Sequence, residues 1–419
     1  MQDLKLTYET LLAIFQNEAY ASIELSHGIK NAQNKGFVTK LIYGVLERNI
    51  EFDYYISKMC QKSPKINVAI ILKMGMYQIK YMDGTPDYAI VNNLVDLTKK
   101  IGKKELSGFV NATLKRFITT KFEMPKEESK ALSVEYSVPE FIVKEYLESF
   151  GKAKTLDILE KKEFECEHYR VNHSKLATDD VLKVLIQNNI SYILDEDFKD
   201  AFYAKNDKIM QDLYAAGKVT VQSKTSMYAT IAMAPHDNDE ILDLCSAPGG
   251  KAVYMAQLAN VKITACDIHP HRLELIKSYV NRMGVQGIEI VENDGTKYNA
   301  KWKNKFDKVL CDVPCSGLGV VEKKPDIYLN LTEESLKDLP NIQFKILDNA
   351  AKYLKDDPAS FIVYSTCTLR HQENQDVIDR FLKVHKDFEL LEDKLYLPDI
   401  SGQDGFYIAT LKRKSNATS

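Results

Sequence analysis

The chain has 419 residues, a formal net charge of −3, and 45% hydrophobic and 27% charged residues. This composition is that of a globular protein and excludes a collagen-like or mainly disordered chain, and the length allows two to four domains. No apolar run approaches the roughly 20 residues of a membrane-spanning helix. The start of the chain, MQDLKLTYETLLAIF, does not resemble a signal peptide. We therefore expect a cytoplasmic protein without a membrane partner.

The seven cysteines do not have the pattern of a disulfide framework or of a metal site. Their number is odd, and no CxxC pair or His/Cys cluster has the spacing of zinc ligands. Several lie inside apolar, strand-like runs, so we expect reduced thiols and no bound metal. The seven are Cys60, Cys166, Cys245, Cys266, Cys311, Cys315 and Cys367.

Residues 1–125 are predicted to form an all-α domain. Apolar residues recur at steps of three and four in the segments 37–56 and 68–82, and this spacing places them on one face of a helix. Breaks near Pro64 and Gly84 lie where helices are expected to stop. The sequence therefore predicts a helical N-terminal domain.

Residues 126–220 are predicted to contain a polar connector and a small α+β subdomain. The segments EHYRVNH and ISYIL alternate between apolar and polar residues as strands do, and DDVLKVLIQNN between them has the pattern of a helix.

Residues 221–415 alternate regularly between strands and helices. Continuous apolar strands separated by helices predict an α/β domain with a doubly wound, parallel, Rossmann-like sheet. In such sheets the ligand lies beyond the carboxyl ends of the strands. The expected strands are EILDLC, KITACDI, IEIVEND, FDKVLCD and FIVYSTC, with FYIATLK closing the chain.

A glycine-containing turn follows the first of these strands. The segment DLCSAPGGK runs from Asp243 to Lys251, and its glycine pair allows the backbone to approach a ligand at the N-terminus of the next helix. The turn has neither the spacing of a P-loop nor that of the GxGxxG dinucleotide motif.

Acidic residues end the next three strands. Asp267 could accept hydrogen bonds from both hydroxyls of a ribose, Asp294 could accept from an adenine amino group, and Asp312 ends the fourth strand. A single acid at a strand end is more often a helix cap or a loop residue. Three acids beside a glycine turn favour a cationic ligand that contains a nucleoside, and S-adenosylmethionine fits this description.

Two cysteines differ from the others because each follows an apolar run and is surrounded by turn residues. They are Cys315 and Cys367. A thiolate that adds to carbon 6 of a cytosine makes carbon 5 nucleophilic enough to attack a methyl sulfonium. Asp312 is the candidate for contacting the N3 edge of that base. This chemistry alone does not decide which cysteine is the nucleophile.

Four segments of the second half resemble the RNA 5-methylcytosine methyltransferases of the Sun/Fmu type: DLCSAPGGK, DVPCSGLGVVEKKPDI, YSTCT followed by HQEN, and DGFYIATL. In the first half, NKGFVTKLIYGVLERNIEFDYYI and GFVNATLKRF are similar to the NusB-like domain that precedes the catalytic domain in the bacterial ribosomal RNA small subunit methyltransferase B family. The resemblance implies an enzyme that methylates carbon 5 of a cytosine through a covalent cysteine adduct, with 16S ribosomal RNA and its cytosine 967 as the target.

The resemblance also implies roles for individual residues. Cys367 would be the nucleophile and Cys315 would assist release of the product, while Asp312 would face both cofactor and base. The expected S-adenosylmethionine site contains Cys245, Ser246, Ala247, Pro248, Gly249, Gly250, Lys251, Asp267, Arg272, Asp294 and Asp312. RNA contacts are expected from Arg170, Lys323 and Lys324. One residue departs from the family pattern, since Ser223 stands where an aspartate is common.

Three alternatives remain at this point. The same chemistry could act on another RNA such as a transfer RNA, and methylation of purified small-subunit RNA against bulk transfer RNA separates these two cases. A non-catalytic RNA-binding assembly factor would have no affinity for S-adenosylmethionine. A DNA cytosine methyltransferase would accept duplex DNA instead of RNA.

Overall fold

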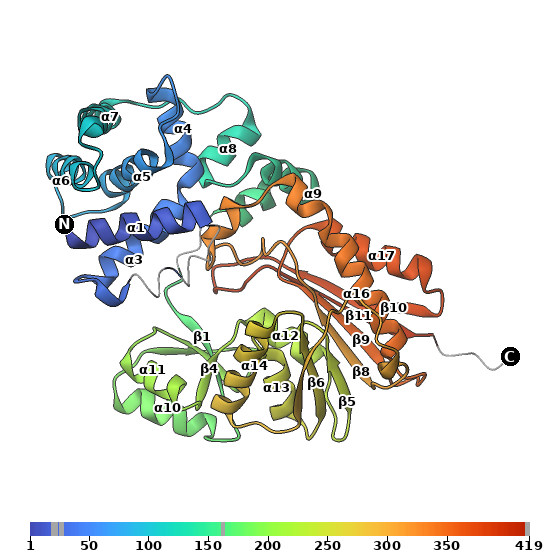
Figure 1. The fold of residues 1–419 in the computed structure, drawn as a ribbon. Coiled ribbons are helices and arrows are strands. Elements are labelled where there is room, and N and C mark those ends of the chain that lie inside the picture. The colour runs from blue at the N-terminus through green and yellow to red at the C-terminus, as the bar shows by residue number, and fades with distance from the viewer. Residues whose placement is uncertain (18–23, 25–28, 161–163, 415–419) are drawn as a thin grey trace. The chain divides into compact units, whose positions relative to one another are not determined.

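A computed structural model describes residues 1–17, 24, 29–160 and 164–414 of the chain. It divides into two compact units, each described here by itself (Figure 1). Unit 1 consists of residues 1–160 and 321–333, and unit 2 of residues 161–320 and 334–419. The expected end of the last domain at residue 415 lies outside the described residues. Among those residues, no helix is long and apolar enough to cross a membrane.

Unit 1 is helical, which confirms the prediction for the N-terminal domain. Its central helix α5 (Ile66–Tyr81) is buried at every position from Val68 to Gln78. At Gly44 an added Cβ would lie 1.9 Å from the Tyr77 ring, so the glycine permits this close packing. The other elements are α1 (Gln2–Asn17), η1 (Ile29–Asn31), α3 (Lys35–Glu47), α4 (Asn49–Met59), α6 (Asp87–Lys100), η2 (Lys104–Leu106), α7 (Ser107–Thr119), α8 (Glu128–Tyr136), α9 (Glu140–Leu159) and η4 (Pro325–Leu329).

The last of these elements comes from far along the chain. The segment 321–333 groups with unit 1, where η4 packs on α3 and Leu329 packs against the helical core. Lys323 and Lys324 therefore belong to unit 1 in this structure, although they lie inside the range 221–415 expected for the α/β domain. The physical reason is the burial of apolar side chains of this segment against the helices.

The smaller sheet of unit 2 has four antiparallel strands in the order β2-β3-β1-β4. Tyr169 of β1 pairs with Phe202 of β3, and both rings are buried. The elements are β1 (Glu167–Val171), α10 (Thr178–Gln187), β2 (Tyr192–Leu194), β3 (Ala201–Ala204), α11 (Lys208–Ala215) and β4 (Val219–Val221).

The larger sheet of unit 2 has seven strands in the order β10-β11-β9-β8-β5-β6-β7. The five expected strands are parallel: β5 (Glu240–Asp243), β6 (Lys262–Asp267), β7 (Ile288–Glu292), β8 (Lys308–Asp312) and β9 (Phe361–Thr366). Two antiparallel strands, β10 (Phe388–Tyr396) and β11 (Phe406–Arg413), complete the sheet. Because only nine residues connect β10 to β11, they form a hairpin, since a parallel crossover needs a longer connection. The sheet is therefore mixed.

Helices cover both faces of this sheet (Figure 1). One face packs against α12 (Lys224–Ala232), α13 (Gly250–Leu258) and α14 (Pro270–Met283), and the other against α16 (Leu339–Tyr353) and α17 (Gln375–Val384). The chain leaves β5 toward β6 and later returns to β8 on the other side of β5. A ligand crevice is expected at such a switch point, at the carboxyl ends of β5 and β8. The shorter elements are η3 (Ala300–Trp302), α15 (Glu333–Lys337) and η5 (His371–Glu373).

Candidate active site

The loop between β5 and α13 has a conformation that requires glycine. Gly249 has a φ of +102°, which only glycine adopts without strain, and it precedes the first residue of α13. An added Cβ there would lie 3.2 Å from Ile276. The Ser246 N–H donates to the Cys266 carbonyl over 2.7 Å, which holds the loop against β6. The N-terminus of α13, with its unpaired first N–H groups, faces the end of the sheet.

Asp267 and Arg272 meet after β6. The Asp267 carboxylate is 3% exposed. It accepts the His269 N–H over 3.0 Å and the Arg272 guanidinium over 3.3 Å. Each carboxylate oxygen retains capacity for a further hydrogen bond. The structure therefore brings these two expected cofactor residues together.

Asp294 is held by its own turn. It accepts the Thr296 hydroxyl over 2.6 Å and the Thr296 N–H over 3.0 Å, and Lys297 lies 3.2 Å away. These interactions, above all that with the Thr296 hydroxyl, hold the pKa of Asp294 below its usual range. The local contacts give Asp294 a structural role in the turn besides the expected one toward an adenine.

Asp312 connects the glycine loop to the strands of the two cysteines. Its carboxylate accepts the Lys251 ammonium over 2.7 Å and the Ser365 hydroxyl over 2.7 Å. Lys251 is the first residue of α13 after the glycine pair, and Ser365 lies on β9. Two expected site residues, Lys251 and Asp312, are therefore paired directly.

Asp243 was not among the expected site residues, although it ends the strand before the glycine loop. Its side chain is buried at the switch point between β5 and β8. The pKa of Asp243 is raised to about 7, mainly by burial and in part by the negative charge of Asp312, against the opposing effect of the Ser246 hydroxyl. A buried acid with such a pKa at a strand end indicates a functional site, and its position at the end of β5 was the signal in the sequence.

The structure brings together the two cysteines that the sequence singled out. Cys315 and Cys367 are 52 residues apart, and their Sγ atoms lie 3.2 Å from each other. The Cys367 N–H also donates to the Cys315 sulfur over 3.3 Å. The hydrogen bond with Cys367, together with burial, holds the pKa of Cys315 well above its usual range. The pair therefore shares one site at the ends of β8 and β9.

The other cysteines of the sheet are packed against apolar side chains. Cys266 and Cys311 are fully buried, and burial raises the pKa of both thiols. Burial also raises the pKa of Cys245, and the charges of Asp243 and Asp312 act in the same direction. These thiols are therefore poor nucleophiles.

The expected RNA contact by Arg170 is wrong, because the residue is completely buried. Its guanidinium lies 4.0 Å from the centre of the Tyr254 ring. It donates to the Gln222 side chain over 2.8 Å and to the Gln257 side chain. Arg170 thus connects β1 to α13 inside unit 2, where RNA cannot reach it.

Ser223 retains the local role that an aspartate would have. It is the N-cap of α12, and its hydroxyl accepts the Ser226 N–H over 3.4 Å. Serine and aspartate are both favoured at this position. The departure from the family pattern therefore leaves the start of the helix capped.

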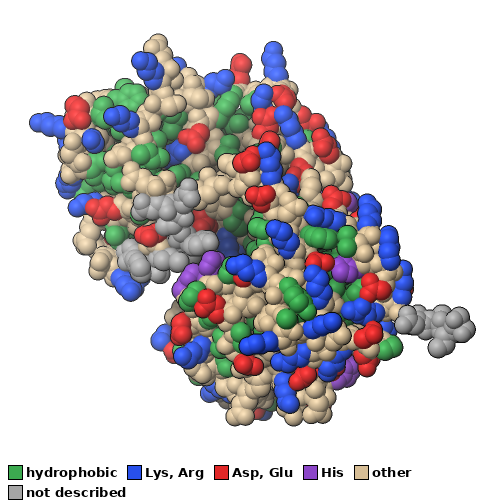
Figure 2. Space-filling view, turned by 45° about the vertical axis from the view of Figure 1, so that its right-hand side comes forward, with side chains coloured by type: hydrophobic (Ala, Val, Ile, Leu, Met, Phe, Trp, Pro, Cys, Tyr) green, Lys and Arg blue, Asp and Glu red, His purple; other side chains and the backbone are tan. Residues whose placement is uncertain are grey.

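Lys323 and Lys324 are exposed in unit 1. On the face seen in Figure 2, Lys and Arg side chains are interspersed with Asp and Glu.

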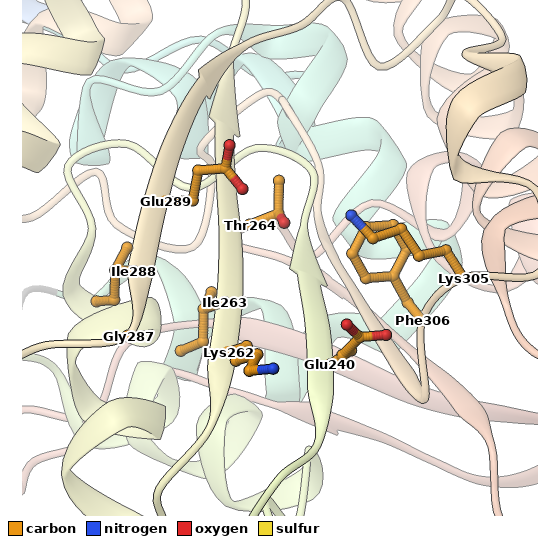
Figure 3. Close-up of a pocket in the computed structure, with 9 residues that line it drawn as sticks. All are labelled: Glu240, Lys262, Ile263, Thr264, Gly287, Ile288, Glu289, Lys305 and Phe306. Carbon is orange, nitrogen blue, oxygen red and sulfur yellow. The ribbon is translucent and has the colours of Figure 1, made fainter.

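A pocket of about 360 Å³ lies at the amino ends of the parallel strands, opposite to the carboxyl ends where the glycine loop and the cysteines lie. It is lined by Glu240, Lys262 and Ile288, the first residues of β5, β6 and β7 (Figure 3). It is therefore separate from the glycine loop and the cysteines. The described residues contain no cluster of side chains suited to a metal ion.

Comparisons with known proteins agree with this architecture. Residues 230–412 match the family model of the 16S rRNA methyltransferase RsmB/F, and residues 1–119 match that of the NusB family. The crystal structure of PH0851 is similar over 98% of both chains, with a TM-score of 0.85 and 22% identity. A methyltransferase homolog from Pyrococcus horikoshii has a TM-score of 0.60 and 23% identity over 69% of this chain and all of its own. These two structures support the fold.

Two relatives match nearly the whole chain. The chain is 31% identical to the probable ribosomal RNA small subunit methyltransferase B of Bacillus subtilis (strain 168), over 97% of both proteins. It is 28% identical to the ribosomal RNA small subunit methyltransferase B of Escherichia coli O127:H6, over 91% of both. The chain therefore belongs to the RsmB/F family of methyltransferases and begins with a NusB family domain.

Proposed function

We propose that this protein transfers a methyl group from S-adenosylmethionine to carbon 5 of a cytosine in small-subunit ribosomal RNA, through a covalent adduct of Cys367. The observation that carries the proposal is the pairing of Cys315 and Cys367, 3.2 Å apart at the ends of β8 and β9. Both matched relatives are named for small-subunit ribosomal RNA, which supports this class of substrate.

The residues at the ends of β5 and β6 fit S-adenosylmethionine. Asp267 is anchored by His269 and Arg272 and can still accept hydrogen bonds from ribose hydroxyls. The glycine turn leads directly into the N-terminus of α13, whose first backbone N–H groups can bind a carboxylate. When bound, the cofactor supplies an electrophilic methyl group on a sulfonium.

Cys367 is the proposed nucleophile. Its thiolate adds to carbon 6 of the cytosine, and the electron pair displaced from the ring double bond allows carbon 5 to take the methyl group. A base, here a water molecule, then takes the proton from carbon 5, and the electron pair of that C–H bond restores the double bond as the bond between carbon 6 and sulfur breaks. Cys315 lies close enough to protonate the departing Cys367 sulfur. Asp312, fixed by Lys251 and Ser365, is placed to orient the base.

Two features of the RNA side remain predictions. Lys323 and Lys324 are exposed and are expected to contact phosphates. The target cytosine is expected to leave its stack to reach Cys367, because a stacked base hides carbon 6. Cytosine 967 of 16S ribosomal RNA is the expected nucleotide, and mapping of 5-methylcytosine in RNA methylated by the purified protein tests it.

A trapping assay tests the proposed function. Cys315→Ala is expected to accumulate a denaturation-resistant protein–RNA adduct with small-subunit RNA and S-adenosylmethionine, whereas Cys367→Ala forms no adduct and does not methylate. If Cys367→Ala forms the adduct instead, Cys315 is the nucleophile and the two roles are reversed. A wild-type protein that methylates transfer RNA but not small-subunit RNA would refute the proposed substrate.

A further inference from the structure

A buried carboxylate contacts the loop that carries Cys315. Glu373, on η5, is fully buried in unit 2. One of its oxygens, Oε2, accepts the backbone N–H of Ser316 over 2.9 Å and the side-chain amide of Gln343 over 2.9 Å. The other, Oε1, lies 3.2 Å from the guanidinium of Arg370. Burying a carboxylate is costly unless it is paired and hydrogen-bonded, so these three donors are what keeps Glu373 in place.

Gln343 extends the same contact to the other side of Cys315. Its Nε2 donates to the Pro314 carbonyl over 2.9 Å as well as to Glu373. Because both neighbours are acceptors, only the amide nitrogen can face them, so the orientation of the side chain is determined. Glu373 and Gln343 together therefore hold the peptide groups immediately before and after Cys315.

The loop of Cys367 is tied to the same group of residues. The Ser316 and Thr368 hydroxyls share a hydrogen bond of 2.7 Å, which connects the residue after Cys315 to the residue after Cys367. The Tyr364 hydroxyl of β9 donates to the Glu373 carbonyl over 2.6 Å. Glu373 is thus fixed to β9, the strand that precedes Cys367, while its carboxylate holds the loop of Cys315.

We propose that Glu373 is a positioning residue that, with Gln343, holds Cys315 against the Cys367 sulfur for the release of the methylated base. The proposal rests on the proposed function, in which Cys367 forms the adduct and Cys315 assists its breakdown. The negative charge of Glu373 also raises the pKa of Cys315 and so favours its protonated form. A protonated Cys315 is the form that can deliver a proton to the departing sulfur.

The first test is a double-mutant comparison with Glu373→Gln, Cys315→Ala and both together. Glu373→Gln preserves shape but places an amide where the carboxylate accepts two hydrogen bonds. We expect turnover to fall about 10- to 100-fold, the loss typical of a misplaced catalytic group, and the denaturation-resistant adduct to accumulate. The double variant should turn over no more slowly than Cys315→Ala, because both changes impair one step. Glu389→Gln, an exposed glutamate on β10, is the matched control and should behave as wild type.

Loss of turnover without accumulation of adduct in Glu373→Gln would overturn the proposal, as would additive effects in the double variant. Gln343→Leu keeps the carboxylate and its contact to Ser316 but removes the amide contacts to Pro314 and to Glu373, so it should show the same effect to a smaller extent. If Cys315→Ala itself forms no adduct while the wild type methylates, the cysteine roles of the proposed function fail.

A second measurement needs neither RNA nor cofactor. In the Cys367→Ala background, alkylation of Cys315 by iodoacetamide is followed by mass spectrometry of its peptide as a function of pH. Glu373→Gln should make this alkylation about tenfold faster at pH 8, which corresponds to about one pKa unit, because a negative charge beside the thiol is removed. An unchanged rate would show that Glu373 does not act on Cys315, whatever the substrate of the enzyme.

Discussion

Arg170→Ala tests whether the buried arginine stabilises unit 2. The change removes the stacking on Tyr254 and leaves the side-chain oxygens of Gln222 and Gln257 without their donor. Each buried polar group left unpaired costs about 1–3 kcal/mol, and a desolvated cation–π contact contributes about 2 kcal/mol. Gln222 is buried whereas Gln257 is only partly buried, so one unpaired buried oxygen and the lost stacking together should lower the free energy of unfolding by about 3–5 kcal/mol.

Urea unfolding followed by tryptophan fluorescence measures this change. The chain has a single tryptophan, Trp302, which is buried in unit 2 and therefore reports on that unit. Lys183→Ala is the control, because this exposed lysine on α10 has only a surface ion pair with Asp180, worth about 0–1 kcal/mol. A loss below about 1 kcal/mol together with a more than tenfold loss of RNA affinity would refute the structural role, since Arg170 would then act on RNA.

Three further predictions concern the cofactor loop and the RNA. The pKa of Asp243 is raised to about 7, mainly by burial. Between about pH 4 and 7 the native state therefore keeps a proton that the unfolded state has lost. As the pH rises through this range, the free energy of unfolding of the wild type should fall by up to about 4 kcal/mol. Asp243→Asn should lack this loss in parallel urea titrations, and identical pH profiles would contradict it. Gly249→Ala should weaken S-adenosylmethionine binding at least about tenfold in calorimetry, because its φ of +102° and a Cβ 3.2 Å from Ile276 displace the loop; unchanged affinity would exclude the loop from the site. Replacing Lys323 and Lys324 by alanine should lower RNA affinity and reduce the slope of log affinity against log salt concentration by about 1–2. An unchanged slope would show that neither lysine contacts the RNA phosphates.

The pattern of apolar residues along the chain was sufficient to predict the helical domain and the five parallel strands. In α5, 11 of the 16 residues are apolar, and the helix is buried at every position from Val68 to Gln78. Most of the parallel strands have an apolar centre and are separated by helices, a pattern with few alternative folds, although β7 is interrupted by Glu289. Strand β11 was expected, but β10 was missed, because residues 388–396 lack a regular alternation of apolar and polar residues and are almost all exposed, as an edge strand can be.

The chemical types of the site residues were also present in the sequence, because the carboxyl ends of parallel strands share one edge of the sheet. The sequence therefore indicated the glycine loop, the strand-end acids and two candidate cysteines. It did not show that Lys251 pairs with Asp312, since that contact depends on how two loops distant in the chain approach each other.

The tertiary structure decided what no local pattern contains. It placed Cys315 and Cys367 3.2 Å apart across 52 residues of chain, and it buried Arg170 and Glu373, two charged residues whose type alone predicts exposure. Local patterns report the periodicity of apolar side chains, which burial of a helix or strand face controls. The partners of a buried charge come from distant segments, so only the folded chain determines whether that charge binds RNA, stabilises the core or positions a catalytic loop.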